Sequence, residues 1–183
     1  MNLTAQPADA SEIALHIVDS LMPLLLFERI LPSTERLLSD VQRLLDFGSG
    51  AGFPGLVLAA ALPRIEFTLA EARRKRSSFL RAAIGETQLS NAQVEAGRFS
   101  PENIRPYFDA VTSRASGPLG DFLQIAGAAL KPNGLAILYA NQTQSIETDS
   151  GQKSGLRMFR RIPYELERAG KPLKRLLAIW RRS

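Results

Sequence analysis

The stretch LLDFGSGAGFPG at residues 44–55 constrains the fold of this chain more than any other. An apolar run ends at Asp46, three glycines alternate at Gly48, Gly50 and Gly52, and a second apolar run follows at 56–62. This order is typical of a β-strand, a tight loop and an α-helix. Glycines let the backbone approach a ligand closely, and the first N–H groups of the helix are free to bind it. The alternative is an ordinary glycine-rich turn without a ligand.

Composition places the chain among water-soluble globular proteins. It has 183 residues, of which 45% are hydrophobic and 22% charged, as expected for one domain. No apolar run approaches the roughly 20 residues of a membrane span, and acidic residues near the start argue against a signal peptide. The chain has no cysteine and one histidine, His16, so we expect no metal site. We expect a cytoplasmic protein without a membrane partner.

The charge is unevenly distributed. Residues 153–183 contain ten basic and two acidic side chains, a net charge of +8, whereas residues 1–152 carry a net charge of −3. A basic segment on a mildly acidic body favours a polyanionic partner such as RNA. The alternative is a solvated basic surface.

The middle of the chain alternates between the two kinds of regular structure. We predict strands at 44–47, 66–70, 92–96, 109–112 and 135–140, and helices at 54–62, 74–87 and 119–130. The repeated strand–helix order predicts an α/β fold of the Rossmann-like kind, with a mostly parallel sheet and helices on both faces.

The flanking segments complete a single domain with three parts. Residues 1–42 are expected to form a short helical cap, with a helix at 11–31 capped by Ser11 and broken or kinked at Pro23, and a helical turn at 37–41. Residues 43–140 form the βαβ core, with a sharp turn at 131–134 before its last strand. Residues 141–183 contain a loop at 141–155 and two closing strands at 156–166 and 174–182.

An acidic residue supports the ligand interpretation of the glycine loop. Glu71 ends the second predicted strand, where an acid accepts hydrogen bonds from ribose hydroxyls in nucleotide-binding sheets. The dinucleotide pattern G-x-G-x-x-G fails from Gly48, because Phe53 takes the sixth position, but it matches formally from Gly50. A dinucleotide-dependent oxidoreductase therefore stays an alternative. The pattern D-x-G-x-G-x-G that begins at Asp46 instead resembles the first motif of S-adenosylmethionine-dependent methyltransferases of the Rossmann-like class.

Further motifs resemble one family, the RsmG family, also called glucose-inhibited division protein B. The matching pieces are Asn2–Ala5, His16 with 19–21, Asp46–Gly55 with its Gly-Phe-Pro-Gly corner, Lys75 with 79–81, Gly97-Arg98, Thr112–Ala115 and 130–132. The resemblance implies S-adenosyl-L-methionine as cofactor and methyl transfer to N7 of a guanine in small-subunit (16S) ribosomal RNA. It also implies 16S ribosomal RNA or the small ribosomal subunit as partner.

Eight residues are the candidate cofactor contacts. The glycine loop supplies Gly50 and Gly52 and the second strand supplies Glu71, while the resemblance implies Gly48, Phe53, Phe99, Ser100 and Arg114. The ring of Phe99 would pack on the adenine, and Ser100 would offer a hydrogen bond near its edge. The guanidinium of Arg114 suits the cofactor carboxylate or an RNA phosphate. The alternatives are an ordinary core role for Phe99 and a structural ion pair for Arg114.

We predict no catalytic acid or base. Guanine N7 has a lone pair and no proton at neutral pH, so orientation of the reactants can supply the catalysis. His16 and Asp19 share one helix face and are expected to organise the cap. The candidate RNA-binding residues are Arg157, Arg160, Arg161, Lys174, Arg175, Arg181 and Arg182. Trp180 could stack on a base but is expected in the core.

Besides the oxidoreductase, two alternatives to this function remain, and both follow from departures at the substrate side. Ala140-Asn141 stands where the family often has lysine-glycine, and Phe99–Pro101 replaces an acidic stretch. These departures allow a methyltransferase of a different substrate, or a non-catalytic RNA-binding ribosome-assembly factor that keeps the fold. We expect a monomer.

Overall fold

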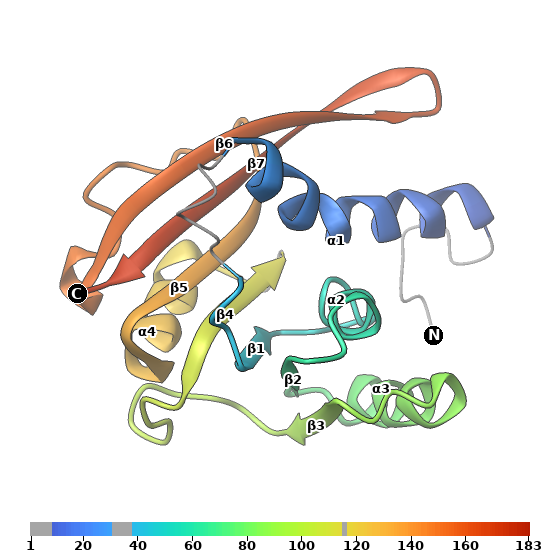
Figure 1. Cartoon of the computed structure of the whole chain (residues 1–183), viewed down its shortest axis with the longest axis horizontal. Helices are drawn as coiled ribbons and strands as arrows, with labels where there is room; N and C mark the ends of the chain where they lie inside the picture. The colour runs from blue at the N-terminus through green and yellow to red at the C-terminus, as the bar shows by residue number, and fades with distance from the viewer. Residues whose placement is uncertain (1–8, 31–37, 115–116) are drawn as a thin grey trace.

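The computed structural model describes residues 9–30, 38–114 and 117–183 (Figure 1). The Asn2–Ala5 piece, the start of the predicted turn at 37–41 and Ala115 lie outside these residues. The helices are α1 (Ala10–Ile30), α2 (Gly55–Ala61), α3 (Arg74–Thr87), α4 (Leu119–Ala129) and the short 3₁₀ helix η1 (Gln152–Ser154). The strands are β1 (Arg43–Phe47), β2 (Glu66–Glu71), β3 (Ala92–Ala96), β4 (Phe108–Arg114), β5 (Leu130–Asn141), β6 (Leu156–Arg168) and β7 (Lys171–Arg182).

The strands form one sheet in the order β3-β2-β1-β4-β5-β7-β6. Strands β1 to β5 pair in parallel, and β7 is antiparallel to both of its neighbours, β5 and β6. The order reverses between β1 and β4, which places a crevice at the carboxyl ends of the strands. The predicted α/β class with a mostly parallel sheet is confirmed.

Helices cover both faces of the sheet, and the alternation of side chains along each strand explains why. Leu44 of β1 packs with Leu58 of α2 and Leu80 of α3. The next residue, Leu45, belongs to the opposite core with Phe122 of α4 and Trp180 of β7. Trp180 is fully buried, and its indole N–H donates to the Ser150 carbonyl at 2.8 Å. It is therefore a core residue, as the sequence predicted.

Helix α1 differs from its prediction in two ways. Its cap is Asp9 instead of Ser11, because the Asp9 carboxylate accepts the Ser11 N–H at 2.8 Å and the Ser11 O–H at 2.6 Å. The helix also continues past Pro23 to Ile30. Pro23 has no N–H to donate to the helix. Tertiary packing stabilises the helix there instead, because Ser20 and Phe27 on either side of Pro23 are buried.

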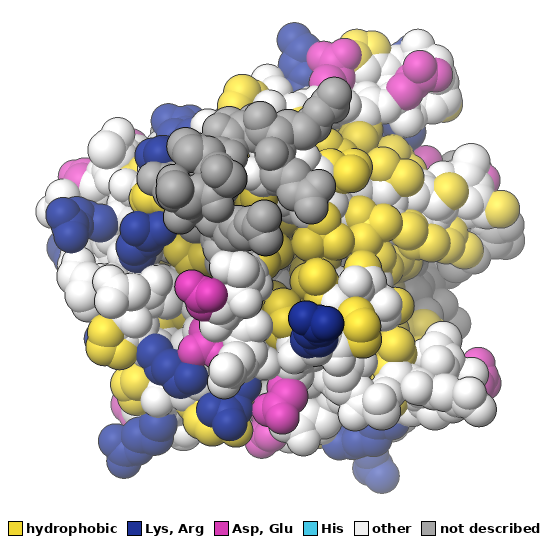
Figure 2. Space-filling model, in the orientation of Figure 1, with side chains coloured by type: hydrophobic (Ala, Val, Ile, Leu, Met, Phe, Trp, Pro, Cys, Tyr) yellow, Lys and Arg dark blue, Asp and Glu magenta, His cyan; other side chains and the backbone are white. Residues whose placement is uncertain are grey.

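One face of α1 remains apolar and exposed. Figure 2 shows hydrophobic side chains gathered over this helix, and the exposed ones include Val18 at 46% and Leu25 at 53%. Residues 10–27 have a mean hydropathy of 1.5 and could cross a membrane by length and composition alone, the one such helix in the described part of the chain. This corrects the expectation that no apolar run reaches that length. The core helix of a soluble protein and a signal sequence near the N-terminus pass the same test, and 28% of this window is buried in the fold.

The last strands are longer than predicted. The expected turn at 131–134 lies within β5: Leu130 pairs with Phe108, and Leu135 pairs with Ala110, so the intervening residues bulge out of the ladder. Strand β6 ends at Arg168 and β7 begins at Lys171, because a two-residue turn joins them. The turn has positive φ at Ala169 and Gly170. Figure 1 shows the tip of this hairpin reaching α1, where Arg168 pairs with Glu12 at 2.7 Å.

Candidate cofactor site

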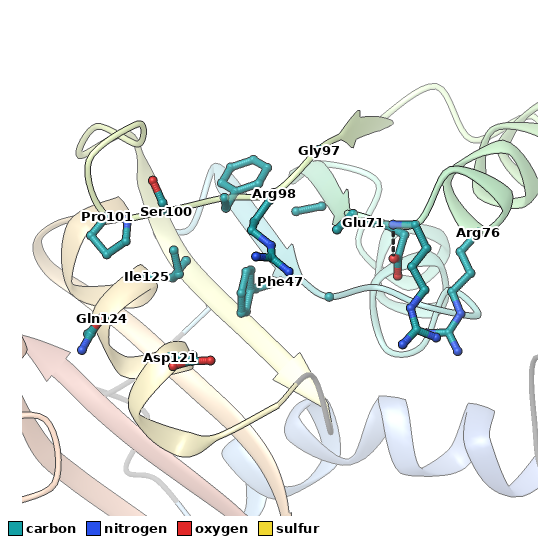
Figure 3. Close-up of a pocket in the computed structure, with 15 residues that line it drawn as sticks. Phe47, Glu71, Arg76, Gly97, Arg98, Ser100, Pro101, Asp121, Gln124 and Ile125 are labelled. Atoms are coloured by element: carbon teal, nitrogen blue, oxygen red, sulfur yellow. Dashed lines mark hydrogen bonds between the residues drawn. The ribbon is translucent and has the colours of Figure 1, made fainter.

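A cavity of about 530 Å³ opens at the carboxyl ends of β1, β2 and β3 (Figure 3). Its volume falls in the range of about 300–1,000 Å³ that is usual for small-molecule sites. The β1–α2 loop, the start of α3, the segment after β3 and one face of α4 enclose it. The lining residues are Phe47, Gly48, Ala70–Arg73, Arg76, Gly97–Pro101, Asp121, Gln124 and Ile125.

Backbone hydrogen bonds hold the glycine loop in place. The N–H groups of Gly48 and Ser49 both donate to the Ala70 carbonyl, at 2.9 and 3.0 Å. Gly48 and Gly50 have φ values of 74° and 58°, which side chains with a Cβ disfavour. The loop therefore crosses the end of β2, and Gly48 is its one glycine that lines the cavity. The expectation of free N–H groups is wrong here, because those of Gly48, Gly50 and Gly55 all donate to groups within the protein.

Asp46 holds the end of the loop through a hydrogen bond and does not line the cavity. Its side chain is buried, and Oδ2 accepts the Gly55 N–H at 3.1 Å. Burial is the main cause that raises the pKa of Asp46 to about 6, while the bond from Gly55 acts in the opposite direction. A Cβ on Gly55 would lie 2.4 Å from both Asp46 Oδ2 and Leu69 Cδ2. The glycine in the Gly-Phe-Pro-Gly corner is thus explained by this close approach.

Glu71 joins the loop to α3. Its carboxylate is 6% exposed; Oε2 accepts the Gly50 N–H at 3.0 Å, and Oε1 accepts the Arg73 N–H at 2.7 Å. Each carboxylate oxygen has a further lone pair. The group is therefore fixed in position beside the cavity and can still accept hydrogen bonds from a ribose.

The cavity fits an adenosyl group. Phe47, Phe99 and Ile125 give it apolar walls, and Glu71 supplies the acid for ribose hydroxyls. A Cβ added to Gly97 would meet nothing within 4 Å, so the segment after β3 leaves open space. Four of the eight predicted cofactor residues line the cavity: Gly48, Glu71, Phe99 and Ser100.

The other four predicted residues lie beside the cavity instead of lining it. Gly50 contributes through its bond to Glu71. A Cβ on Gly52 would lie 2.3 Å from Leu56 Cδ1, so this glycine is required by packing against α2. Phe53 and Arg114 meet each other under α1, with the guanidinium 5.2 Å from the ring centroid.

Asp19 of α1 holds this second cluster together. It is 1% exposed, and its carboxylate accepts hydrogen bonds from Tyr164 Oη at 2.6 Å, Arg175 Nη2 at 3.1 Å and Arg114 Nη1 at 3.3 Å. One carboxylate thus ties α1 to β4, β6 and β7. Arg114 makes the structural ion pair that was its alternative interpretation.

His16 packs at the edge of the same cluster. Its ring centroid lies 5.3 Å from that of Phe53, and Nδ1 lies 3.4 Å from Arg114 Nη1. Burial, and then the charge of Arg114, lower the pKa of His16. The lowered pKa favours the neutral ring, and the role of His16 and Asp19 in organising the cap stays a prediction.

The prediction missed three arginines of the cavity. Arg73 and Arg76 flank the start of α3, and Arg98 follows Gly97 after β3. Each comes just after a strand of the parallel sheet or at the start of the next helix, where ligand contacts gather. That position was readable from the sequence.

The basic residues of the β6–β7 hairpin differ in exposure and in the groups that they contact. Arg157, Arg160, Arg161 and Lys174 are exposed. Arg160 and Arg181 stack on the Phe159 ring, at 4.5 and 4.0 Å from its centroid.

Arg175 and Arg182, two of the predicted RNA contacts, bind to other elements of the fold instead. Arg175 pairs with Asp19 and also donates to Asn141 Oδ1 at 2.6 Å. Arg182 donates to the carbonyls of Gly127 and Ser154. Both side chains therefore connect parts of the fold.

Comparison with known proteins gives consistent matches. A family model described as "rRNA small subunit methyltransferase G" matches residues 1–161. The curated proteins named ribosomal RNA small subunit methyltransferase G include relatives from Polynucleobacter asymbioticus and Sorangium cellulosum. The first is 36% identical over 73% of this chain and 59% of its own length, and the second is 38% identical over 78% and 57%. This chain thus spans about three fifths of the length of these relatives.

Solved structures share the fold at much lower sequence identity. A methyltransferase from Pyrococcus furiosus has a TM-score of 0.66 at 17% identity, covering 90% of this chain and 83% of its own. A structure described as a sarcosine dimethylglycine methyltransferase from Galdieria sulphuraria has a TM-score of 0.66 at 13% identity, covering 91% and 85%. These structures support the Rossmann-like methyltransferase fold.

Proposed function

This chain belongs to the rRNA small subunit methyltransferase G family, and we propose that it transfers a methyl group from S-adenosylmethionine to N7 of a guanine in 16S ribosomal RNA. The family and fold predicted from the sequence are confirmed, and together they imply this cofactor. The observation that carries the proposal is the cavity between Gly48, Glu71, Phe99 and Ser100, which fits an adenosyl group at the crevice of a methyltransferase fold.

The cavity residues divide the binding of the cofactor among them. Glu71 would accept hydrogen bonds from the ribose, since both of its oxygens are fixed by backbone N–H groups. Phe99 would pack against the adenine face, and Ser100 would meet its polar edge. The backbone at Gly48 would approach the methionine part.

The chemistry requires orientation more than proton transfer. The cofactor supplies an activated methyl group on a sulfonium, and guanine N7 attacks with its own lone pair. Holding two reactants in line is worth up to about 7–11 kcal/mol in favourable cases. His16 takes no proton in this scheme; its neutral ring packs on Phe53 and supports the loop beside the cavity.

The RNA would contact the β6–β7 hairpin. The exposed side chains of Arg157, Arg160, Arg161 and Lys174, with Arg181, suit phosphate contacts that add affinity without selecting a sequence. Arg175 and Arg182 are left out because their side chains connect separate elements of the fold. The same proposal describes a monomer that acts on the small ribosomal subunit in the cytoplasm, without a membrane partner or a resident metal.

A labelling experiment tests the function. The protein is incubated with methyl-labelled S-adenosylmethionine and small ribosomal subunits that lack the modification, and the labelled base is mapped. Label on a single 16S guanine at N7 supports the proposal. Label elsewhere favours a methyltransferase of a different substrate, and tight binding to the subunit without label favours an assembly factor that keeps the fold.

A further inference from the structure

The lining of the cavity contains more positive than negative side chains. Arg73, Arg76 and Arg98 line it, against two carboxylates, Glu71 and Asp121. Figure 3 shows Arg98 extending into the cavity from the segment after β3, with Arg76 beyond Glu71 on the α3 side. If a Cβ were present at Gly50, Arg76 Nη1 would lie 3.7 Å from it, so this guanidinium stands over the glycine loop.

These three guanidinium groups have no hydrogen bond or ion pair with any side chain or carbonyl in residues 9–30, 38–114 and 117–183. Glu71 accepts the backbone N–H groups of Gly50 and Arg73, and no guanidinium of the described residues. Arg73 and Arg98 are exposed and Arg76 is half-buried, so all three lie at the mouth of the cavity. Other arginines of this chain pair internally: Arg114 and Arg175 with Asp19, and Arg168 with Glu12.

S-adenosylmethionine does not explain the cluster. The molecule bears a sulfonium and an ammonium against one carboxylate, so its net charge is positive, and its ribose end carries no anion. Three guanidiniums beside Glu71 would repel it. Phosphate, in contrast, is an anion that planar guanidiniums bind through pairs of hydrogen bonds.

We propose that Arg73, Arg76 and Arg98 form a subsite for a phosphate group of the RNA substrate at the ribose end of the cofactor cavity. The subsite rests on the proposed function and adds a coupling to it. When the RNA phosphate neutralises the guanidiniums, the repulsion of the positively charged cofactor falls. RNA therefore raises the affinity for the methyl donor, and by linkage the donor raises the affinity for RNA by the same factor.

The coupling also distinguishes the two forms of the cofactor. The demethylated product, S-adenosylhomocysteine, has lost the sulfonium charge and is neutral overall. The free arginines therefore favour the product over the methyl donor. The bound phosphate removes this preference, so that the donor is held best when the acceptor RNA is present.

The test measures binding instead of turnover. Calorimetry gives the affinities of S-adenosylhomocysteine and of an unreactive analogue in which a protonated amine replaces the sulfonium, each with and without unmodified 16S ribosomal RNA. The proteins are the wild type, the triple variant Arg73→Gln, Arg76→Gln, Arg98→Gln, and the control Arg74→Gln. Arg74 is exposed on the same turn of α3 but does not line the cavity.

Without RNA, the triple variant should bind the charged analogue about two- to eightfold more tightly than the wild type, at about twofold for each exposed charge removed. Its affinity for S-adenosylhomocysteine should stay the same. RNA should strengthen binding of the analogue by a similar factor in the wild type and in Arg74→Gln, but not in the triple variant.

Three outcomes would overturn the subsite. The ratio of the two affinities stays unchanged in the triple variant, or the RNA effect persists there. Alternatively, inorganic phosphate or adenosine monophosphate alone reproduces the whole effect, which assigns the site to a free anion instead of RNA. If neither cofactor form binds the wild type, the proposed function falls as well, so the two failures can be told apart.

Discussion

Replacing Asp19 with alanine should destabilise the protein far more than any single surface change. The carboxylate is 1% exposed and accepts bonds from Tyr164, Arg114 and Arg175. Removing one partner of a buried ion pair costs about 3–5 kcal/mol, because the remaining charges stay desolvated. The side chains of Arg114 and Arg175 keep 13% and 19% of their exposure. Some water can reach them, so we expect a loss near the lower end, about 3 kcal/mol.

The assay is urea unfolding followed by far-ultraviolet circular dichroism, with thermal melts as a second measurement. A loss of about 3 kcal/mol should lower the melting temperature by about 6–12 °C for a chain of this length. Asp19→Asn should fall between the wild type and Asp19→Ala, because the amide oxygen still accepts the Tyr164 hydroxyl but no longer balances the two arginines.

Glu12→Ala is the matched control. Glu12 lies on the same helix and pairs with Arg168 of the same hairpin, but the Arg168 side chain is 46% exposed. Water replaces that ion pair at little cost. Glu12 is itself buried, at 8% exposure, so the two variants differ in how exposed the arginine partner is. Equal losses for Asp19→Ala and Glu12→Ala would refute the reasoning, because they would show that exposure of the partner does not decide the cost.

Three further predictions concern the loop and the hairpin. The pKa of Asp46 is about 6 in the folded protein against 3.8 for the exposed group, so the native state holds this proton more tightly and its contribution to stability is lost as the pH rises from about 4 to 6. The free energy of unfolding of Asp46→Asn, measured with urea and taken relative to the wild type, should therefore rise by up to about 3 kcal/mol between pH 4 and pH 7. A difference that does not change with pH contradicts this. Gly50→Val should abolish calorimetric binding of S-adenosylmethionine, because valine strains a backbone with φ of 58°, whereas Gly170→Val, at a hairpin turn with φ of 73°, should bind normally. The double variant Arg157→Gln, Lys174→Gln should bind 16S ribosomal RNA with a shallower dependence on salt, its log–log slope reduced by about 1–2; an unchanged slope would remove the hairpin from the RNA surface.

Local sequence patterns determined most of the core fold. The helix at 74–87 and the strand at 92–96 have the predicted bounds, because apolar periodicity and flanking turns are local signals. The glycine rhythm, with Glu71 at the next strand end, located the cavity for a related reason. In a parallel sheet, residues at strand ends meet at one edge whatever the details of packing.

Tertiary structure decided the parts that depend on distant partners. The sequence predicted closing strands at 156–166 and 174–182, but only the fold placed β7 between β5 and β6. Which arginines stay free depends on carboxylates far away in sequence: Asp19 binds Arg114 and Arg175 across 95 and 156 residues.

The glycine loop shows the same division within a few residues. Its sequence alone indicated a backbone that approaches a ligand, since only glycine tolerates the conformation. Only the fold showed that Gly52 and Gly55 serve packing against Leu56 and Asp46. Only the fold, too, brought Arg73, Arg76 and Arg98 together around Glu71, because charges from separate strand ends become neighbours once the sheet has formed.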